Sequence, residues 1–359
     1  MRTSSWSVLR TLLFLLVFGL IAPAQETITG VKRIVAVGDI HGGYDEFVAI
    51  LRAAGIVDGS NQWTGGASHL VQTGDCLDRG AASRKVMDLL MTLEGQARKA
   101  KGRVHVLLGN HEAMNMYGDL RYTSAGEYAA FKGADSAEVR DRAYDILAEP
   151  AMKDDAAYRA KWDAEHPLGW AEHRQAFGPS GKYGKYLRER PAILRIDNTL
   201  FLHGGISQKY VTTPMAELNK KIRAELKDFG LLQGGVTTDE LGPLWYRGLA
   251  LDPEDGLAGL VEEIDKSFGV TRIVLGHTPT TGAVMPRFGG RVVLIDVGLS
   301  KAYNQSLACL LIEDGKAYAL HRGTKLELPA GKDITAYLAE AARLDPPGSN
   351  LRKAVEGGR

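Results

Sequence analysis

The stretch VHVLLGNHEAMNMYG, residues 104–118, runs from a mostly apolar segment directly into Gly109, Asn110, His111 and Glu112. The apolar segment has the length and composition of a buried β-strand. An amide, an imidazole and a carboxylate are costly to bury without partners, so a core strand has no packing reason to end in them. One such ending is weak evidence of a functional site, and its weight depends on whether other strands end in the same way.

Four further short apolar segments also end in glycine and polar residues. They are RIVAV before GDIHGG, HLVQT before GDCLDRG, TLFL before HGGIS, and RIVL before GHTPT. Apolar repeats of helical period separate the early segments, at residues 44–55 and 81–102. Residues 307–321, LACLLIEDGKAYALH, are typical of a β-hairpin with Asp314 and Gly315 at its turn. This alternation predicts an α/β fold with a central sheet, whose functional groups gather on loops beyond the carboxyl ends of strands.

The segments between these strands divide the chain further. We predict one catalytic domain over residues 31–330, interrupted at 113–198 by a mostly helical insertion that caps the site. A second insertion is expected at 208–268. Residues 331–359 predict a short helix followed by a flexible C-terminal tail, because DPPGSN and a polar end follow the last helical pattern.

Residues 1–24 are typical of a secretory signal peptide. Arg2 and Arg10 have no acidic counterpart, and a short apolar run follows them. Small residues at A-x-A spacing then end at Ala24. A membrane anchor is the alternative, but the run is shorter than the roughly 20 residues that span a bilayer. We therefore expect a secreted or periplasmic protein that is cleaved near Ala24, with no stable membrane association afterwards.

The net charge limits the kinds of binding partner, and the cysteine content limits the possible disulfides. Cleavage would change the formal net charge from +1 to −1, because residues 1–24 hold two basic and no acidic side chains. A nearly neutral protein has no electrostatic basis for binding nucleic acid or acidic membranes. Cys76 and Cys309 cannot form a disulfide scaffold, and both adjoin apolar, strand-like residues. We expect two buried free thiols, although export would permit a disulfide between them.

The polar strand endings share one chemistry. They supply two carboxylates, three imidazoles and one amide oxygen, with no thiolate, which suits divalent cations such as Mn, Fe or Zn. One carboxylate can bridge two ions about 3.5 to 4 Å apart, and such a pair activates a water and clamps a phosphoryl group. The candidate ligands, in chain order, are Asp39, His41, Asp75, Asn110, His203 and His277.

Each ending has an ordinary structural interpretation when it is taken alone. A GD after a strand is usually a turn, and a histidine in HGG or GHT is usually a loop residue. Asn110 could be the cap of a helix. These interpretations do not easily account for five endings in this order, each directly after an apolar strand. The set therefore predicts a metal site.

The order GDxHG, GDxxDRG, GNHE, HGG and GH, over about residues 33–300, resembles the calcineurin-like metallophosphoesterases. The arginine of GDCLDRG and the complete GNHE resemble the phosphoprotein phosphatase branch of that superfamily. Within this branch, GNHEAMNMYGDLRY, FLHGGIS and PLWYRG are similar to the bacterial Shewanella-like phosphatases. The resemblance implies an α/β fold with a central β-sandwich flanked by helices, to which the helical insertion is added.

The resemblance also implies a role for each candidate ligand. Asp39 and His41 would hold the first metal ion, and Asp75 would bridge both ions. The remaining three candidates would complete the second site. Two divalent metal ions would be the cofactors, with Mn as the first expectation and Fe or Zn as the alternatives.

Further residues match catalytic positions of the family. His111 would be the general acid that protonates the leaving oxygen, and Asp78 would orient it. Arg79 would hold phosphate oxygens through its planar guanidinium. Arg247, in LWYRG, is the candidate for a second phosphate-binding arginine, with a solvated surface arginine as the alternative. Asp296, in LIDVG, either hydrogen-bonds a ligand histidine or is a turn residue.

We therefore expect a dinuclear metal-dependent phosphomonoesterase in which a metal-bridging hydroxide attacks phosphorus directly. The resemblance implies phosphoserine, phosphothreonine or phosphotyrosine esters as substrates. Hydrolysis of nucleotides or dinucleoside polyphosphates on the same metal site is the alternative. A non-catalytic metal-binding protein on this fold is a different class, but such proteins are expected to lose a ligand or the acid, and here all are present. A nuclease is disfavoured by the neutral charge.

Overall fold

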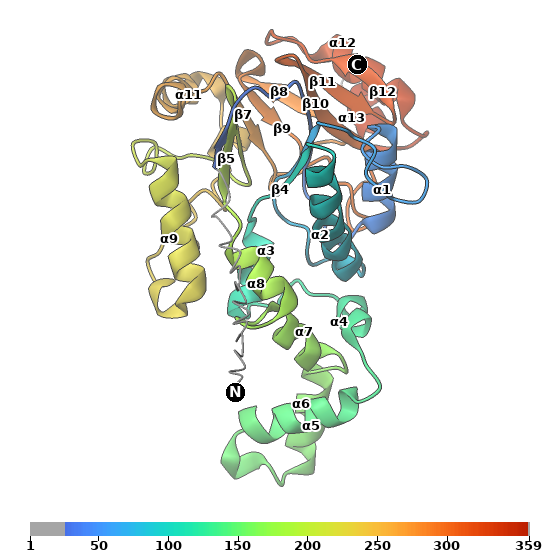
Figure 1. Cartoon of the computed structure of the whole chain (residues 1–359), viewed down its shortest axis with the longest axis vertical. Helices are drawn as coiled ribbons and strands as arrows, with labels where there is room; N and C mark the ends of the chain where they lie inside the picture. Colours follow the sequence, from blue (N-terminus) through green and yellow to red (C-terminus); the bar gives the residue numbers. More distant parts are fainter. Residues whose placement is uncertain (1–25, 358–359) are drawn as a thin grey trace, which may run out of the picture.

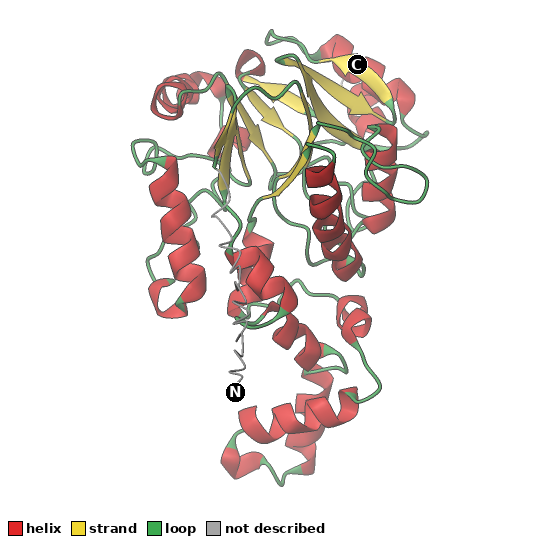
Figure 2. Ribbon diagram, in the orientation of Figure 1, coloured by secondary structure: helices red, strands yellow, loops and turns green. Residues whose placement is uncertain are grey.

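The computed structural model describes residues 26–357, which form two six-stranded β-sheets facing each other (Figures 1 and 2). The first sheet holds, in spatial order, β12 (Thr324–Glu327), β11 (Lys316–His321), β10 (Ala308–Glu313), β2 (Arg33–Val37), β3 (His69–Gln72) and β4 (Arg103–Val106). The second holds β1 (Thr27–Ile28), β5 (Ile193–Ile196), β6 (Thr199–Leu202), β7 (Arg272–Leu275), β9 (Val292–Leu294) and β8 (Met285–Arg287). The predicted α/β fold with a central β-sandwich is confirmed. The predicted signal peptide lies outside the described residues.

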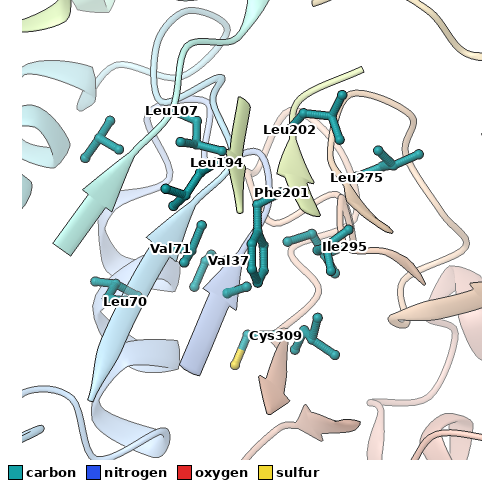
Figure 3. Packing of buried hydrophobic residues seen from close by; sticks show 14 of the residues in the cluster. Val37, Leu70, Val71, Leu107, Leu194, Phe201, Leu202, Leu275, Ile295 and Cys309 are labelled. Atoms are coloured by element: carbon teal, nitrogen blue, oxygen red, sulfur yellow. The ribbon is translucent and has the colours of Figure 1, made fainter. Parts of the chain in front are cut away.

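Apolar side chains from both sheets fill the layer between them. Phe201 of β6 and Val37 of β2 come from different sheets and belong to the same buried cluster (Figure 3), both with almost no exposed surface. Paired sheets of this kind enclose a core about 10 Å thick in which side chains interdigitate. Cys76 and Cys309 are buried and unbridged, as the sequence predicted.

Three strands in each sheet run parallel, and they carry the polar endings. β2 pairs with β3 and β3 with β4, in the register that sets Val37 opposite Gln72 and Gln72 opposite Val106. β6 pairs with β7 and β7 with β9, again in parallel. Because parallel strands present their carboxyl ends at one edge, the loops after these strands meet at one end of the sandwich. The five strands predicted to precede the candidate ligands are all present.

Helices pack beside the first sheet and also form the C-terminal segment of the chain. α1 (Tyr44–Ala53) and α2 (Ser83–Lys99) follow β2 and β3 and turn their apolar residues inward beside the first sheet (Figure 1). α12 (Thr335–Leu344) matches the predicted C-terminal helix. The prediction of a flexible tail is wrong over residues 350–357. That segment forms α13 (Asn350–Gly357), which is anchored because Leu351 is buried in the main core.

The first insertion forms a helical arm that extends away from the sheets (Figure 2). Its helices are α3 (Asn110–Tyr117), α4 (Ala125–Phe131), α5 (Ser136–Leu147), η1 (Pro150–Met152), α6 (Ala156–Glu165), α7 (Trp170–Phe177) and α8 (Lys182–Arg188). Tyr144, Ala148 and Trp162 make a small second core within it. The predicted range 113–198 extends too far, because its last residues form β5, whose buried isoleucines pair with β6 in the second sheet.

The second insertion is also helical. It comprises α9 (Met215–Lys227), η2 (Phe229–Leu231), α10 (Gly248–Leu251) and α11 (Glu254–Phe268), while η3 (Phe288–Gly290) lies between β8 and β9. The predicted hairpin is formed by β10 and β11, with positive φ at both Asp314 and Gly315, as a two-residue turn of this kind requires. Within residues 26–357, none of the helices has the length and apolarity needed to cross a membrane.

Candidate metal centre

The loops after β2, β3, β4, β6 and β7 bring all six candidate ligands into one buried cluster. Asp75 lies at its centre, with Oδ2 3.2 Å from His203 Nε2 and 3.7 Å from His41 Nε2. Two groups of possible metal-binding atoms share Asp75, one with His41 and His111 and the other with His203 and His277. Within each group the atoms lie within 4.8 Å of one another. A carboxylate shared in this way is the arrangement that a bridging ligand requires.

The hydrogen bonds of His41 and His203 aim Nε2 of each ring at this centre. His41 Nδ1 donates to the carbonyl oxygen of Leu77 at 2.8 Å, and His203 Nδ1 donates to that of Thr73 at 3.0 Å. Because a carbonyl only accepts, Nδ1 of each ring carries a proton and Nε2 is the nitrogen that faces the centre. Burial lowers the pKa of His41 to about 4, so this ring is neutral and its Nε2 presents a lone pair. His203 Nε2 faces the amide oxygen of Asn110 at 2.9 Å as well as the central carboxylate. Both of these oxygens accept, so either a proton on Nε2 or a metal cation bound between the three groups would satisfy them.

His277 offers its other ring nitrogen and joins the two sheets. Its Nε2 donates to the carbonyl oxygen of Trp245 at 3.1 Å, which leaves Nδ1 unprotonated. Its main-chain N–H donates to the carboxylate of Asp39 at 3.0 Å, linking the loop after β7 to the loop after β2. Arg247 Nη1 donates to the carbonyl oxygen of His277 at 2.6 Å and to Thr278 Oγ1 at 3.1 Å. Arg247 therefore lies at the rim of the cluster and not on a remote surface.

Several carboxyl groups are buried close together in the cluster, and nearby positive charge would stabilise their ionised forms. Burial, together with the charges of Asp296 and Asp75, raises the pKa of Asp39 well above its ordinary value. Burial also raises the pKa of Asp296 to about 6. Asp296 accepts a hydrogen bond from the main-chain N–H of Gly298 at 3.0 Å, as the turn interpretation expects, and no bond to a ligand histidine is present among the described residues. Its charge acts on the candidate ligand Asp39. Anionic oxygens and imidazole lone pairs in this proximity fit divalent metal ions.

Glu112 ties the loops of the first sheet together, a role that the sequence did not reveal. Its two oxygens accept main-chain hydrogen bonds from Asp75 at 2.7 Å, Cys76 at 2.8 Å and Gly109 at 2.8 Å. In the opposite direction, the N–H of His111 at the start of α3 donates to Asp75 Oδ1 at 3.0 Å. A Cβ atom at Gly109 would lie 2.2 Å from the same Asp75 oxygen, so only glycine permits this approach.

Several candidate residues adopt left-handed backbone conformations. The φ angles are 44° at His41, 58° at Asp75, 67° at Asp78, 64° at Arg79 and 66° at His277. Positive φ is uncommon for residues other than glycine and carries a cost in free energy that clusters at functional sites. The hydrogen bonds described above hold these loops in place.

His111 and Asp78 form the contact that their predicted roles require. His111 Nδ1 donates to Asp78 Oδ2 at 2.6 Å, so Nε2 faces the cluster, 3.8 Å from Asp75 Oδ2. Burial alone would lower the pKa of His111, but Asp75 and Asp78 outweigh it and the pKa is raised. Asp78 also accepts hydrogen bonds from Asn115 Nδ2 at 2.9 Å and Thr123 Oγ1 at 2.8 Å. These donors fix the carboxylate against which the imidazole is oriented.

Asn115 and Thr123 were missed in the sequence. Asn115 lies four residues after His111 on α3, so helical spacing was an available signal. Thr123 had no such signal, because it comes from the loop between α3 and α4, whose path depends on the tertiary fold. Arg79 lies beside this loop, and its exposed guanidinium makes no hydrogen bond or ion pair with the described residues. An unpaired guanidinium next to the cluster is available to an anion.

Three comparisons agree with this geometry. The sequence pattern of the calcineurin-like phosphoesterase family matches residues 32–296. An uncharacterised protein of Schizosaccharomyces pombe is 33% identical over 316 residues, which cover 82% of each chain. Shewanella-like protein phosphatase 2 of Arabidopsis thaliana is 26% identical over 281 residues, covering 75% of this chain and 72% of the relative.

A solved structure is also similar over most of its length. The crystal structure of a cold-active protein-tyrosine phosphatase from a psychrophilic Shewanella species superposes with a TM-score of 0.65. The two chains are 29% identical, and the alignment covers 85% of this chain and 82% of the other. The similarity extends beyond the metal-binding loops to the two-sheet architecture and its helices.

Proposed function

We propose that this chain, which belongs to the calcineurin-like phosphoesterase family, removes phosphate from phosphoserine, phosphothreonine and phosphotyrosine side chains of proteins. Membership rests on the family pattern over residues 32–296, and relatives in the family are named phosphatases, so the chain is a metal-dependent phosphatase. The main support for the proposal is the position of Asp75, because its carboxylate belongs to both groups of possible metal-binding atoms.

The residues present fit two divalent ions, for which Mn is our first expectation. Asp39 and His41 would hold the first, Asp75 would bridge, and the three remaining candidate ligands would complete the second. When bound, the ions supply a reactive water and neutralise charge on the phosphoryl group. His41 Nε2 and His203 Nε2 already face the shared carboxylate, so the side chains would need little rearrangement to bind the ions.

The protein side chains would then divide the remaining work. His111 would donate a proton to the departing oxygen through Nε2, while Asp78 keeps its partner Nδ1 protonated and the ring in place. Arg79 would hold phosphoryl oxygens, because its guanidinium is exposed beside His111 and has no other acceptor among the described residues. Arg247 would reach them from its position next to His277.

The alternative function is hydrolysis of nucleotides or dinucleoside polyphosphates. A panel of substrates distinguishes it from the dephosphorylation of proteins. The test uses residues 25–359 with Mn, and compares phosphotyrosine, phosphoserine and phosphothreonine peptides with nucleotides and diadenosine tetraphosphate. Peptide turnover that disappears in an Asp75→Asn variant supports the proposal. Turnover of nucleotides alone moves the chain to the alternative, and silence on every substrate with metal bound supports a non-catalytic protein.

We also propose that the substrates lie outside the cytoplasm. This rests on residues 1–24, whose basic start, short apolar run and A-x-A exit are typical of an export signal. Expression of the full chain, followed by fractionation and N-terminal sequencing, tests the idea. A mature end near Gln25 in the exported fraction is the expected result, and an intact Met1 in the cytoplasm contradicts it.

A further inference from the structure

Four aromatic rings and one guanidinium form a closed circle at the open edge of the metal centre. The Cζ atom of Arg79 lies 4.7 Å from the ring centre of Tyr122 and 5.4 Å from that of Tyr303. Tyr122 lies 5.1 Å from the ring of His111, and Tyr303 lies 5.6 Å from the ring of His41. The two imidazoles close the circle at 4.7 Å from each other, edge to face.

The positions of both tyrosines are set by their backbones. The main-chain carbonyl of Tyr122 accepts a hydrogen bond from the Arg79 N–H at 3.0 Å, and the next residue, Thr123, binds Asp78. Tyr303 lies in a turn after β9, where its N–H donates to the carbonyl of Ser300 at 2.9 Å. The rings therefore reach the same site from the helical insertion and from the second sheet, two segments far apart in the sequence.

Neither ring is placed there by the needs of the core. Tyr122 is 39% exposed and Tyr303 is half-buried. Neither phenol hydroxyl makes a hydrogen bond with another side chain or main-chain group in the part of the chain that the structure describes. Large amphipathic rings that remain solvent-accessible beside a catalytic centre are well suited to contact an aromatic ligand.

The direction of the leaving group selects Tyr122 as the first contact. If His111 protonates the leaving oxygen, that oxygen lies within about 2.6 to 3.2 Å of its Nε2. In phosphotyrosine a phenyl ring is bonded directly to this oxygen, so it would extend past the imidazole towards the neighbouring Tyr122 ring. In phosphoserine the same oxygen carries a single methylene, which offers no π face for an offset or edge-to-face contact.

We propose that Tyr122 and Tyr303 form an aromatic subsite that receives the phenyl ring of phosphotyrosine and makes aryl phosphate monoesters the preferred substrates. This inference rests on the proposed phosphatase function and assigns its substrate class. Tyr122 is the primary wall, because it adjoins the proposed acid, and Tyr303 is the facing wall beside His41. A simpler role for both rings would be to hold the guanidinium of Arg79 through cation–π contacts.

The experiment measures kcat/KM on two peptides that differ only in carrying phosphotyrosine or phosphoserine. Tyr122→Ala should lower kcat/KM for the phosphotyrosine peptide by about 3- to 10-fold more than for the phosphoserine peptide, the range expected for one aromatic pair. Tyr122→Phe keeps the ring and should keep the preference. Tyr318→Ala is the matched control, because this tyrosine on β11 also holds a cation, Lys325, over its ring, but lies two strands away from β2.

Inhibition by inorganic phosphate separates the two roles of the rings. If they select the phenyl ring, the inhibition constant of phosphate stays within about twofold of wild type in Tyr122→Ala. Equal losses on both peptides, with weaker phosphate inhibition, would show that the rings only position Arg79 and would overturn the inference. Tyr303→Ala repeats the test at the facing wall, and melting temperatures show whether each variant is folded.

Failure of the proposed function has a different signature. If the wild-type protein turns over neither peptide, the proposed function fails, and the subsite assignment fails with it. If it turns over both peptides without a preference that depends on Tyr122, the function stands and only the subsite is overturned. If nucleotide turnover, and not peptide turnover, falls in Tyr122→Ala, the rings stack on a base and the assignment to phosphotyrosine is wrong.

Discussion

Asp78 Oδ2 accepts a hydrogen bond from His111 Nδ1 at 2.6 Å, and this contact determines which imidazole nitrogen faces the metal centre. With Nδ1 engaged, only Nε2 is available to a leaving group. The nearest oxygen of the proposed bridging ligand, Asp75 Oδ2, is 3.8 Å from Nε2. The two nitrogens of the imidazole therefore have different roles: Nδ1 binds the carboxylate that orients the ring, and Nε2 is the proposed proton donor.

Replacing His111 should discriminate between leaving groups. For His111→Asn we expect kcat on a phosphoserine peptide to fall by about 10²- to 10⁴-fold, the usual contribution of a general acid. p-Nitrophenyl phosphate should be affected far less, because its leaving group needs little protonation. His166→Asn, in the helical arm and stacked on Trp162, is a control that should retain activity on both substrates. Equal losses on the two substrates would refute the general-acid assignment.

Removing the donor at Thr123 should act through Asp78. Thr123→Val deletes the hydroxyl that donates to Asp78 Oδ1 at 2.8 Å while keeping the shape of the side chain. We expect kcat on phosphoserine peptides to fall several-fold with little change in KM. One hydrogen bond typically contributes about 1 kcal/mol, and here that energy holds Asp78, and through it His111, in position. Thr123→Ser should restore the rate. A change confined to KM would place Thr123 in substrate binding instead.

Metal removal should lower stability as well as activity. In the metal-free protein, buried carboxylates lie close to one another, and burial, with the charges of Asp296 and Asp75, raises the pKa of Asp39. Mn at 100 times its dissociation constant would contribute about 2.7 kcal/mol of stability. Thermal unfolding of chelator-treated protein, with and without added Mn, measures this contribution. Added Mn should raise the melting temperature of the wild type more than that of Asp75→Asn. If Mn leaves both melting temperatures unchanged, the proposed metal centre is wrong.

Truncating the core between the sheets should destabilise the fold without touching the ligands. Phe201→Ala removes a fully buried ring from β6, directly before the loop that carries His203. We expect a loss of roughly 3 to 5 kcal/mol in the free energy of unfolding, measured by urea denaturation. Phe229→Ala, whose ring is 38% exposed, is the matched control and should change stability by less than about 1 kcal/mol. Similar losses in both variants would contradict this description of the core.

The candidate ligands were accessible from the sequence because their signal is local. Each follows a short apolar strand, as Asp75 follows β3 and His277 follows β7, and within each sheet the parallel strands place their carboxyl ends at one edge. The packing of the two sheets then brings these two edges together. The roles of Arg79 and Arg247 depended on the family resemblance, and the structure places both at the rim of the cluster. The flexible tail was predicted wrongly because the burial of Leu351 is a long-range contact that a polar composition conceals.

The sequence by itself determined an α/β fold with a central sheet, the identity of the candidate ligands and the chemistry they share, because strand patterns and residue types are properties of short segments. The arrangement as two facing sheets was available only from the family resemblance. Only the tertiary structure decided which atoms meet. The N–H of His277 reaches Asp39 across 238 residues of chain, and Thr123 and Tyr122 reach the Asp78 loop from an insertion whose path no local pattern specifies. Hydrogen bonds and ring contacts act over a few ångströms, so the packing of the two sheets and the helical arm fixed the details of the site.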